Sequence, residues 1–236
     1  MAKKSIIFIV YRVQIKVFVM VSSVDEMIEK IKIDCSDFIR DISPSGKVMY
    51  RGMKNIPDEL HQNMSCGKSV PDYDDAYWNT FFNDYLSKNK ILKRESVSYG
   101  TSKKETAAGY GNCFYVFPVN GYKSAFSTKY KDLYCALENW LEYDAENDAY
   151  YESSRSKLRT QLSDARGDMH IIKIYCEISP KMRKFIKTNF MDRADFKNGD
   201  MAEAMKLGVE VWFTGAYHAI PVSLIEESNL MAKIFE

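Results

Sequence analysis

The apolar positions of this chain change their spacing several times, and each change predicts a new secondary-structure element. Intervals of three and four residues, typical of one face of an amphipathic helix, connect Val24, Met27, Ile28, Ile31, Cys35 and Phe38. A second helix is predicted to open at Pro71-Asp72, and it carries a wide aromatic face. Continuous or alternating apolar runs predict strands over 47–51, 113–119, 169–178, 208–213 and 218–222.

Polar helices are predicted between these strands. A short helix is expected over 103–110, and leucines recur at helical spacing from about 129 to 166. Pro180 favours the start of a further helix, and 195–206 is also expected to be helical. No linker rich in Pro, Gly and Ser divides the chain. The pattern therefore predicts one α+β domain over 1–236.

The N-terminal segment 1–21 begins like a signal peptide, with two lysines before an apolar run. Arg12, Gln14 and Lys16 then alternate with apolar residues, which is the pattern of a strand, and no small-residue cleavage site follows. A membrane-spanning helix needs about 20 mostly apolar residues, more than this segment supplies. We therefore expect a strand or an arm here, and no membrane association.

Composition narrows the class of protein further. The 236 residues include 46% hydrophobic and 28% charged side chains with a net charge of +1, values typical of a globular domain without a broad basic surface. The five cysteines form no C-x-x-C pair, which favours reduced thiols in a cytoplasmic compartment. His61, His170 and His218 are far apart in the sequence and match no metal motif, so no metal site is predicted.

Three separate features carry candidate chemistry: Arg51-Gly52 at the end of a predicted strand, the segment Tyr99-Gly100-Thr101-Ser102, and Glu210 in an apolar strand. Each also has an ordinary structural interpretation. A strand-end Arg commonly forms a weak surface ion pair. Thr101 or Ser102 could cap the helix predicted over 103–110, and a strand Glu can face solvent. Their order along the chain favours the functional interpretation.

That order resembles the mono-ADP-ribosyltransferase superfamily, in the branch with an Arg, Ser-Thr-Ser, Glu signature. Pro118-Val119-Asn120-Gly121 and the segment from Glu210 to Gly215 are similar to two further motifs of the family. Similar proteins occur among bacterial toxins and in bacteriophages. The resemblance implies a twisted, mainly antiparallel two-sheet core flanked by helices, with a helical insertion at about 129–206. It also implies a cytoplasmic enzyme, in the host cytoplasm if a phage encodes it.

The resemblance further implies NAD as substrate and a protein or nucleic acid as the macromolecular acceptor, with an antitoxin or host protein as a further partner. In this family pattern Glu210 is catalytic and hydrogen-bonds a ribose hydroxyl, where its carboxylate would stabilise an oxocarbenium-like centre. Thr101 and Ser102 would orient it. Arg51 would bind the pyrophosphate as a bidentate donor. The remaining predicted NAD-binding residues are Gly52, Tyr99 and Tyr110.

Several alternatives remain open at this stage. Gly100 stands where the family has the first Ser of Ser-Thr-Ser, and Ser98 could supply the hydrogen bond expected of that serine. Gly208 stands where many members carry Glu or Gln. Glu177 competes with Glu210 for the catalytic role, and Phe126-Ser127-Thr128 competes with the segment at 101–102. A catalytically inactive binding module of the same fold, or an interaction protein that uses the helical insertion, is the alternative function.

Overall fold

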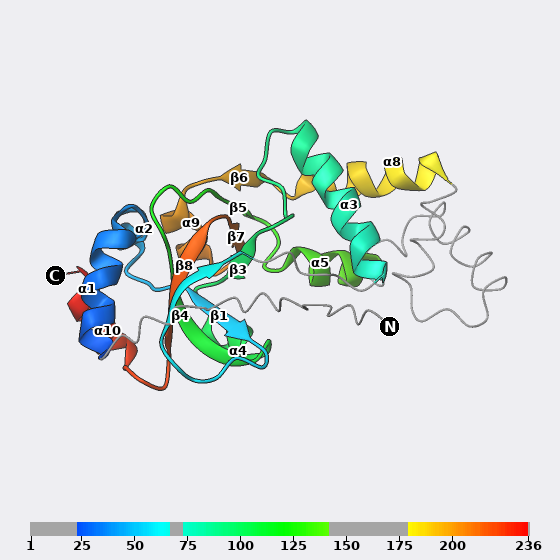
Figure 1. Cartoon of the computed structure of the whole chain (residues 1–236). Coiled ribbons are helices and arrows are strands. Elements are labelled where there is room, and N and C mark those ends of the chain that lie inside the picture. Colours follow the sequence, from blue (N-terminus) through cyan, green and yellow to red (C-terminus); the bar gives the residue numbers. More distant parts are fainter. Residues whose placement is uncertain (1–22, 67–72, 142–178, 236) are drawn as a thin grey trace, which may run out of the picture.

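The structure, a computed structural model, describes residues 23–66, 73–141 and 179–235. It is an α+β fold in which two antiparallel sheets are flanked by helices (Figure 1). This confirms the predicted class and the two antiparallel sheets. The predicted N-terminal strand or arm at 1–21 and the strand at 169–178 lie outside the described residues.

The first sheet has the strand order β1-β4-β8-β2. Its strands are β1 (Tyr50–Met53), β4 (Asn112–Pro118), β8 (Ala216–Pro221) and β2 (His61–Ser65). The apolar runs predicted at 113–119 and 218–222 become the two central strands, since strands buried on both faces need apolar side chains at successive positions. Within β1, Arg51 pairs with Phe114 and Gly52 with Cys113.

The second sheet has the order β3-β7-β5-β6 and is built of shorter strands. They are β3 (Ser98–Gly100), β7 (Val211–Phe213), β5 (Ser124–Ser127) and β6 (Phe196–Asn198). Tyr99 of β3 pairs with Trp212 of β7, which in turn pairs with Ala125 of β5. The segment competing for the Ser-Thr role, 126–128, thus largely belongs to an interior strand of this sheet.

A backbone bridge joins the two sheets. The Tyr50 N–H donates to the Thr101 carbonyl over 2.7 Å, and the Thr101 N–H donates back over 2.9 Å. Because this bridge connects β1 with the end of β3, Arg51 is brought beside Tyr99, 48 residues further along the chain. The candidate site lies at this junction.

Two hydrophobic cores support the sheets. The first lies against the β1-β4-β8-β2 sheet and receives side chains from α1 (Val24–Asp34), α2 (Ser36–Ile42), α9 (Met201–Leu207) and α10 (Glu227–Phe235). The second surrounds Trp212 and receives side chains from α3 (Tyr73–Lys88), α5 (Leu133–Asn139) and α8 (Pro180–Asn189). Helices α3, α5 and α8 therefore lie at one end of the molecule, and α1, α2 and α10 at the other (Figure 1).

Several sequence-based boundaries need correction. The single helix predicted from 24 to 38 is two helices separated at Cys35, whose backbone leaves the helical conformation at φ −121°. The first strand spans 50–53 rather than 47–51, and the loop expected after it contains β2. Residues 195–206 are not one helix, because β6 precedes α9. Short edge strands such as β6 have too few residues to show a period.

The helical insertion predicted at about 129–206 is therefore only partly helical in the residues described. It contributes α5, α8 and α9, but β6 pairs with β5 and completes the second sheet. The short helix expected over 103–110 is confirmed as α4 (Lys104–Ala108), which packs on β1. The C-terminal helix α10 was not predicted.

A buried histidine makes the stability of this fold depend on pH. The His218 side chain has no solvent exposure, its Nε2 lies 2.9 Å from Asp34 Oδ2, and its Nδ1 has no hydrogen-bond partner among the described residues. Burial lowers the pKa of His218 from 6.5, and this outweighs the opposing effect of Asp34. The unfolded chain therefore takes up this proton at a higher pH than the folded protein does.

We expect the free energy of unfolding to fall as the pH is lowered through about 6.5 toward 5. Urea denaturation at several pH values measures it, and His218→Gln should remove most of this slope. The lowered pKa of Asp34 adds a further loss only below its usual value of 3.8. A slope in the wild type that His218→Gln leaves unchanged would contradict the assignment.

Candidate active site

A cavity of about 560 Å³ lies where the two sheets meet. Its lining comes from β1, α3, the chain between α3 and β3, β3, α4, α5 and residues beside these elements. The lining residues are Tyr50, Arg51, Gly52, Asn79, Arg94, Tyr99, Gly100, Thr101, Thr106, Ala107, Tyr110, Lys131, Asp132, Tyr134, Cys135 and Glu210. The cavity thus brings together every predicted site residue except Ser102.

Glu210 lies directly before β7, not inside it as predicted. Its N–H donates to the Lys131 carbonyl over 2.7 Å, which ties the chain ahead of β7 to the chain ahead of α5. Its Oε1 accepts a 2.6 Å hydrogen bond from Arg94 Nη1. Burial raises the pKa of the Glu210 carboxyl above 4.5, although the Arg94 charge opposes this. The carboxylate is therefore desolvated and held on one side by a cation.

Arg51 points into the cavity because successive residues of a strand face opposite sides. The Tyr50 ring on the other face is buried, and its hydroxyl donates to Glu227. Arg51 Nη1 donates to the Tyr99 carbonyl over 2.9 Å, and its Nε is buried without a hydrogen-bond partner among the described residues. A buried donor without a partner is costly, so a ligand that accepted from Nε would gain from it.

Gly52 allows α4 to approach β1. A Cβ built at Gly52 would lie 1.9 Å from the Ala107 carbonyl oxygen and 2.9 Å from Tyr110 Cβ. Only glycine fits between this strand and this helix. Tyr110 follows α4 at the rim of the cavity, half exposed, and its hydroxyl donates to Asp132 Oδ2 over 2.9 Å. Burial and the Asp132 carboxylate raise the pKa of Tyr110, so its phenol stays protonated.

Thr101 and Ser102 have partners other than Glu210. Thr101 is buried, and its Oγ1 accepts from the Lys103 N–H over 3.3 Å. Ser102 Oγ donates to the Met205 carbonyl over 2.6 Å, so it secures the last turn of α9 and does not line the cavity. The capping interpretation therefore holds only in part. The N-cap residue of α4 is Lys103, whose side chain accepts no hydrogen bond from the helix, and Thr101 binds the N–H of that residue and not an N–H of the helix.

The two glycines that depart from the family pattern have structural roles. A Cβ at Gly100 would lie 2.7 Å from Met49 Cγ and Sδ, so a serine there would require the Met49 side chain to move. Ser98, the suggested replacement, is buried and does not line the cavity. Gly208 ends α9 with a φ of +67°, a conformation that glycine adopts without strain.

Arg94 is the residue that sequence reasoning missed. It lies between Lys93 and Glu95, which are exposed and form an ion pair of 3.1 Å, and no pattern in the sequence separates it from them. Its side chain is nevertheless only 6% exposed. The guanidinium carbon lies 4.8 Å from the Tyr99 ring centre and 5.2 Å from that of Trp212. Two rings and Glu210 therefore hold this cation inside the fold.

Asp132 is a second carboxylate in the cavity. It precedes α5, and its Oδ1 accepts from the N–H groups of Tyr134 and Cys135, both over 2.9 Å, as a helix N-cap does. Its Oδ2 accepts from Tyr110. Both oxygens are thus engaged in structure, whereas Glu210 Oε2 has no hydrogen-bond partner in the described part of the chain.

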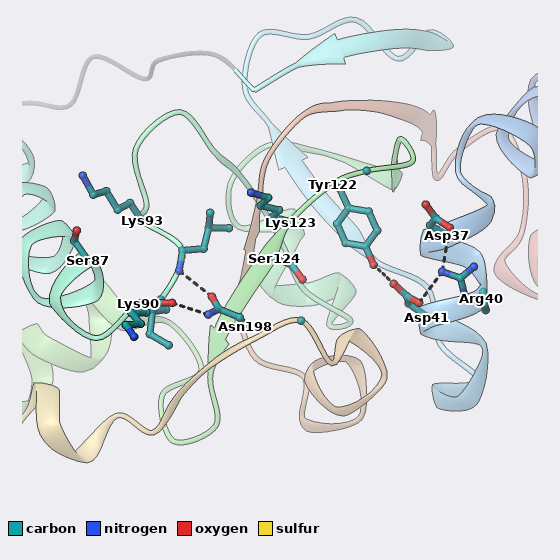
Figure 2. A pocket seen from close by; sticks show the side chains of 14 residues that line it. Asp37, Arg40, Asp41, Ser87, Lys90, Lys93, Tyr122, Lys123, Ser124 and Asn198 are labelled. Carbon is teal, nitrogen blue, oxygen red and sulfur yellow. Dashed lines mark hydrogen bonds and ion pairs between the residues drawn. The ribbon is translucent and has the colours of Figure 1, made fainter.

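The competing Ser-Thr segment at 126–128 does not line this cavity. Ser127 is buried, and its Oγ donates to the Ala194 carbonyl over 2.5 Å. Glu177 lies outside the described residues. A larger, more open groove of about 850 Å³ lies between α2 and the chain after α3, with Asp37 and Asp41 on one side and Lys90 and Lys93 on the other (Figure 2). It contains none of the predicted site residues.

Within the described ranges, no group of three or more His, Cys, Asp or Glu side chains is arranged to hold a metal ion, and the four cysteines there are free thiols. No helix in that part of the chain is long and apolar enough to cross a membrane. Comparisons with protein-family models, curated proteins and solved structures find no significant match. A function is therefore argued from the residues of the cavity.

Proposed function

We propose that the protein is an NAD-dependent mono-ADP-ribosyltransferase that transfers ADP-ribose from NAD to a macromolecular acceptor. One observation carries the proposal. Arg51-Gly52, Tyr99 to Thr101 and Glu210 come from three distant parts of the sequence and line one cavity. Its volume of about 560 Å³ lies within the range of about 300–1,000 Å³ that is typical of small-molecule sites.

The proposed reaction breaks the bond between the nicotinamide nitrogen and ribose C1′, and nicotinamide leaves with the bonding electron pair. Positive charge then develops at C1′ and the ring oxygen. Glu210 Oε2 has no hydrogen-bond partner among the described residues, so the carboxylate is suited to accept a hydrogen bond from a ribose hydroxyl and to stabilise that charge. The acceptor nucleophile bonds to C1′ and loses its proton. Water as nucleophile would give NAD hydrolysis.

Arg51 supplies the matching group for the anionic half of NAD. Its Nη1 donates to the Tyr99 carbonyl, and its Nε is a buried donor without a partner in the described part of the chain, so the guanidinium is oriented before a ligand binds. Pyrophosphate oxygens are suited to such a planar donor. Tyr110, at the rim, remains available for ring stacking, whereas one face of the Tyr99 ring is occupied by Arg94.

Arg51→Lys is expected to weaken NAD binding by about tenfold or more although the charge is retained. An ammonium group cannot hold the Tyr99 carbonyl and present a second directed donor, and a hydrogen bond to a charged group contributes about 1.5–3 kcal/mol. Isothermal titration calorimetry measures the affinity. Arg40→Lys on α2, an exposed arginine outside the cavity, is the matched control. Equal affinities for wild type and Arg51→Lys would make Arg51 a structural residue.

Incubation with NAD labelled in the adenylate half tests the function directly. Purified protein is mixed with a whole-cell lysate, and the labelled products are digested with protease or with nuclease. Label retained on a polymer supports transfer, and the digestion identifies the acceptor class. NAD hydrolysis without a labelled polymer would restrict the activity to water, and no NAD consumption would overturn the proposal.

A catalytically inactive binding module of the same fold is the second candidate, because Arg94 already occupies one oxygen of Glu210. Binding of a non-hydrolysable NAD analogue without turnover would favour it. The sequence contains two basic clusters that are candidate docking surfaces for a polyanionic acceptor, Arg155 to Arg166 and Lys181 to Lys187. Arg183 and Lys187 on α8 are exposed, whereas the other cluster, with Arg155 and Arg159, lies outside the described residues. An antitoxin or host-protein partner remains part of the proposal.

A further inference from the structure

Arg94 is an unusual residue to find beside a candidate catalytic carboxylate. It is an almost fully buried cation on the irregular chain between α3 and β3, and its backbone makes hydrogen bonds as well as its side chain. The Arg94 N–H donates to Asn83 Oδ1 over 2.6 Å, and the Arg94 carbonyl accepts from the Tyr99 hydroxyl over 3.3 Å. The guanidinium has little freedom to leave Glu210.

Its side chain is fixed on two further sides. The rings of Tyr99 and Trp212, which are paired neighbours on β3 and β7, face the guanidinium carbon at 4.8 and 5.2 Å. Cation–π contacts of this kind strengthen when water is excluded. Arg94 contacts both the Trp212 ring and Glu210, which lies two residues earlier in the chain, directly before β7. The two rings of the second sheet therefore orient the Arg94 guanidinium toward Glu210.

We propose that Arg94 is a positioning residue for Glu210: its guanidinium fixes Oε1, keeps the carboxylate ionised in a desolvated cavity, and leaves Oε2 to receive a ribose hydroxyl. The inference rests on the proposed function and deepens it. Arg94 does not contact the substrate in this assignment. It acts by keeping a partly buried carboxylate in its anionic form, which would otherwise be costly in such a site.

Other charged or titratable groups face Glu210 from the surrounding elements: Arg51 on β1, Tyr99 on β3, Tyr110 after α4, Lys131 and Asp132 before α5, and Cys135 in α5. Asp132 acts against ionisation of Glu210, and Arg51 favours it less strongly than Arg94 does. Removal of Arg94 would therefore leave Glu210 beside the Asp132 carboxylate without the cation that mainly favours its ionisation.

Arg94→Met, which retains much of the length and packing of the side chain, tests the inference. We expect the turnover number for NAD on the acid limb of the pH profile to fall about tenfold for each unit by which that limb moves, with little change in KM, and to recover as the pH is raised. The acid limb of the pH profile should move upward by about one unit or more, the size of effect that a nearby opposite charge has. Arg94→Lys should restore part of the loss. Lys93→Met, at the exposed neighbouring position, should behave as wild type.

A second readout does not depend on turnover. Carbon-13 NMR titration of the glutamate carboxyl groups, with the Glu210 resonance assigned by its absence in Glu210→Gln, should show the Glu210 pKa rising in Arg94→Met. If Arg94→Met does not fold, the same pH profile and Glu210 titration are measured on Arg94→Gln, with the same expected results. Identical Glu210 titration in wild type and variant, or a loss of turnover that is equal at every pH, would overturn the role of Arg94. A wild-type protein that consumes no NAD but shows the titration shift would instead overturn only the proposed function.

Discussion

Glu210→Gln is expected to lower NAD turnover by about a hundredfold or more while the fold and NAD binding are retained. Removal of one electrostatic stabiliser of a developing charge typically costs this much. The glutamine amide oxygen can still accept from Arg94, which lies 2.6 Å from Oε1 in the wild type, so no buried guanidinium is left without its partner. The effect should therefore appear in the turnover number and much less in KM.

Steady-state release of nicotinamide measures this effect, and circular dichroism together with thermal unfolding checks the fold. Glu203→Gln is the matched control, because Glu203 is a carboxylate on α9 that pairs with Lys197 outside the cavity. Turnover at the wild-type level in Glu210→Gln would exclude Glu210 as the catalytic residue. Loss of turnover in Glu177→Gln would then assign the role to Glu177.

Gly52→Ala is expected to damage both stability and NAD binding. The new Cβ would lie 1.9 Å from the Ala107 carbonyl oxygen, a backbone atom that cannot move unless α4 moves as a unit away from β1. Overpacking of this kind costs about 1–3 kcal/mol and occasionally more. Displacement of α4 also carries Tyr110 away from Asp132, so the rim of the cavity changes with the core.

Urea denaturation measures the stability of Gly52→Ala, and calorimetry measures its NAD affinity. Gly109→Ala, at the end of the same helix, is the matched control. Its nearest Cβ contact is an ordinary 3.4 Å, and its φ of −61° suits alanine, so it should be neutral or slightly stabilising. If Gly52→Ala were as stable as Gly109→Ala, the close approach of α4 to β1 would not be a constraint on the fold.

The class of fold could be predicted from the sequence, as could the central strands β4 and β8 and the helices α3, α4 and α8, because each of these elements has a long apolar run, a helical period or a terminal signal of its own. The sequence also singled out Arg51, Gly52 and Glu210 as candidates through their residue types and order. It did not separate β5, β6 and β2 from loops. Such short strands are defined by the neighbours with which they pair, and their own residues carry little periodic signal.

Which polar residues are buried, and which partners they have, depends on the packing of distant parts of the chain. Arg94 has the same local sequence character as exposed Lys93 and Glu95, yet it is enclosed because β3, β7 and Glu210, 116 residues away, meet around it. Ser102, chosen as a partner of Glu210, instead bonds to α9. A hydrogen bond or ion pair across such separations depends on the closure of the Tyr50–Thr101 bridge and the packing of two sheets, and these long-range contacts leave no local pattern in the chain.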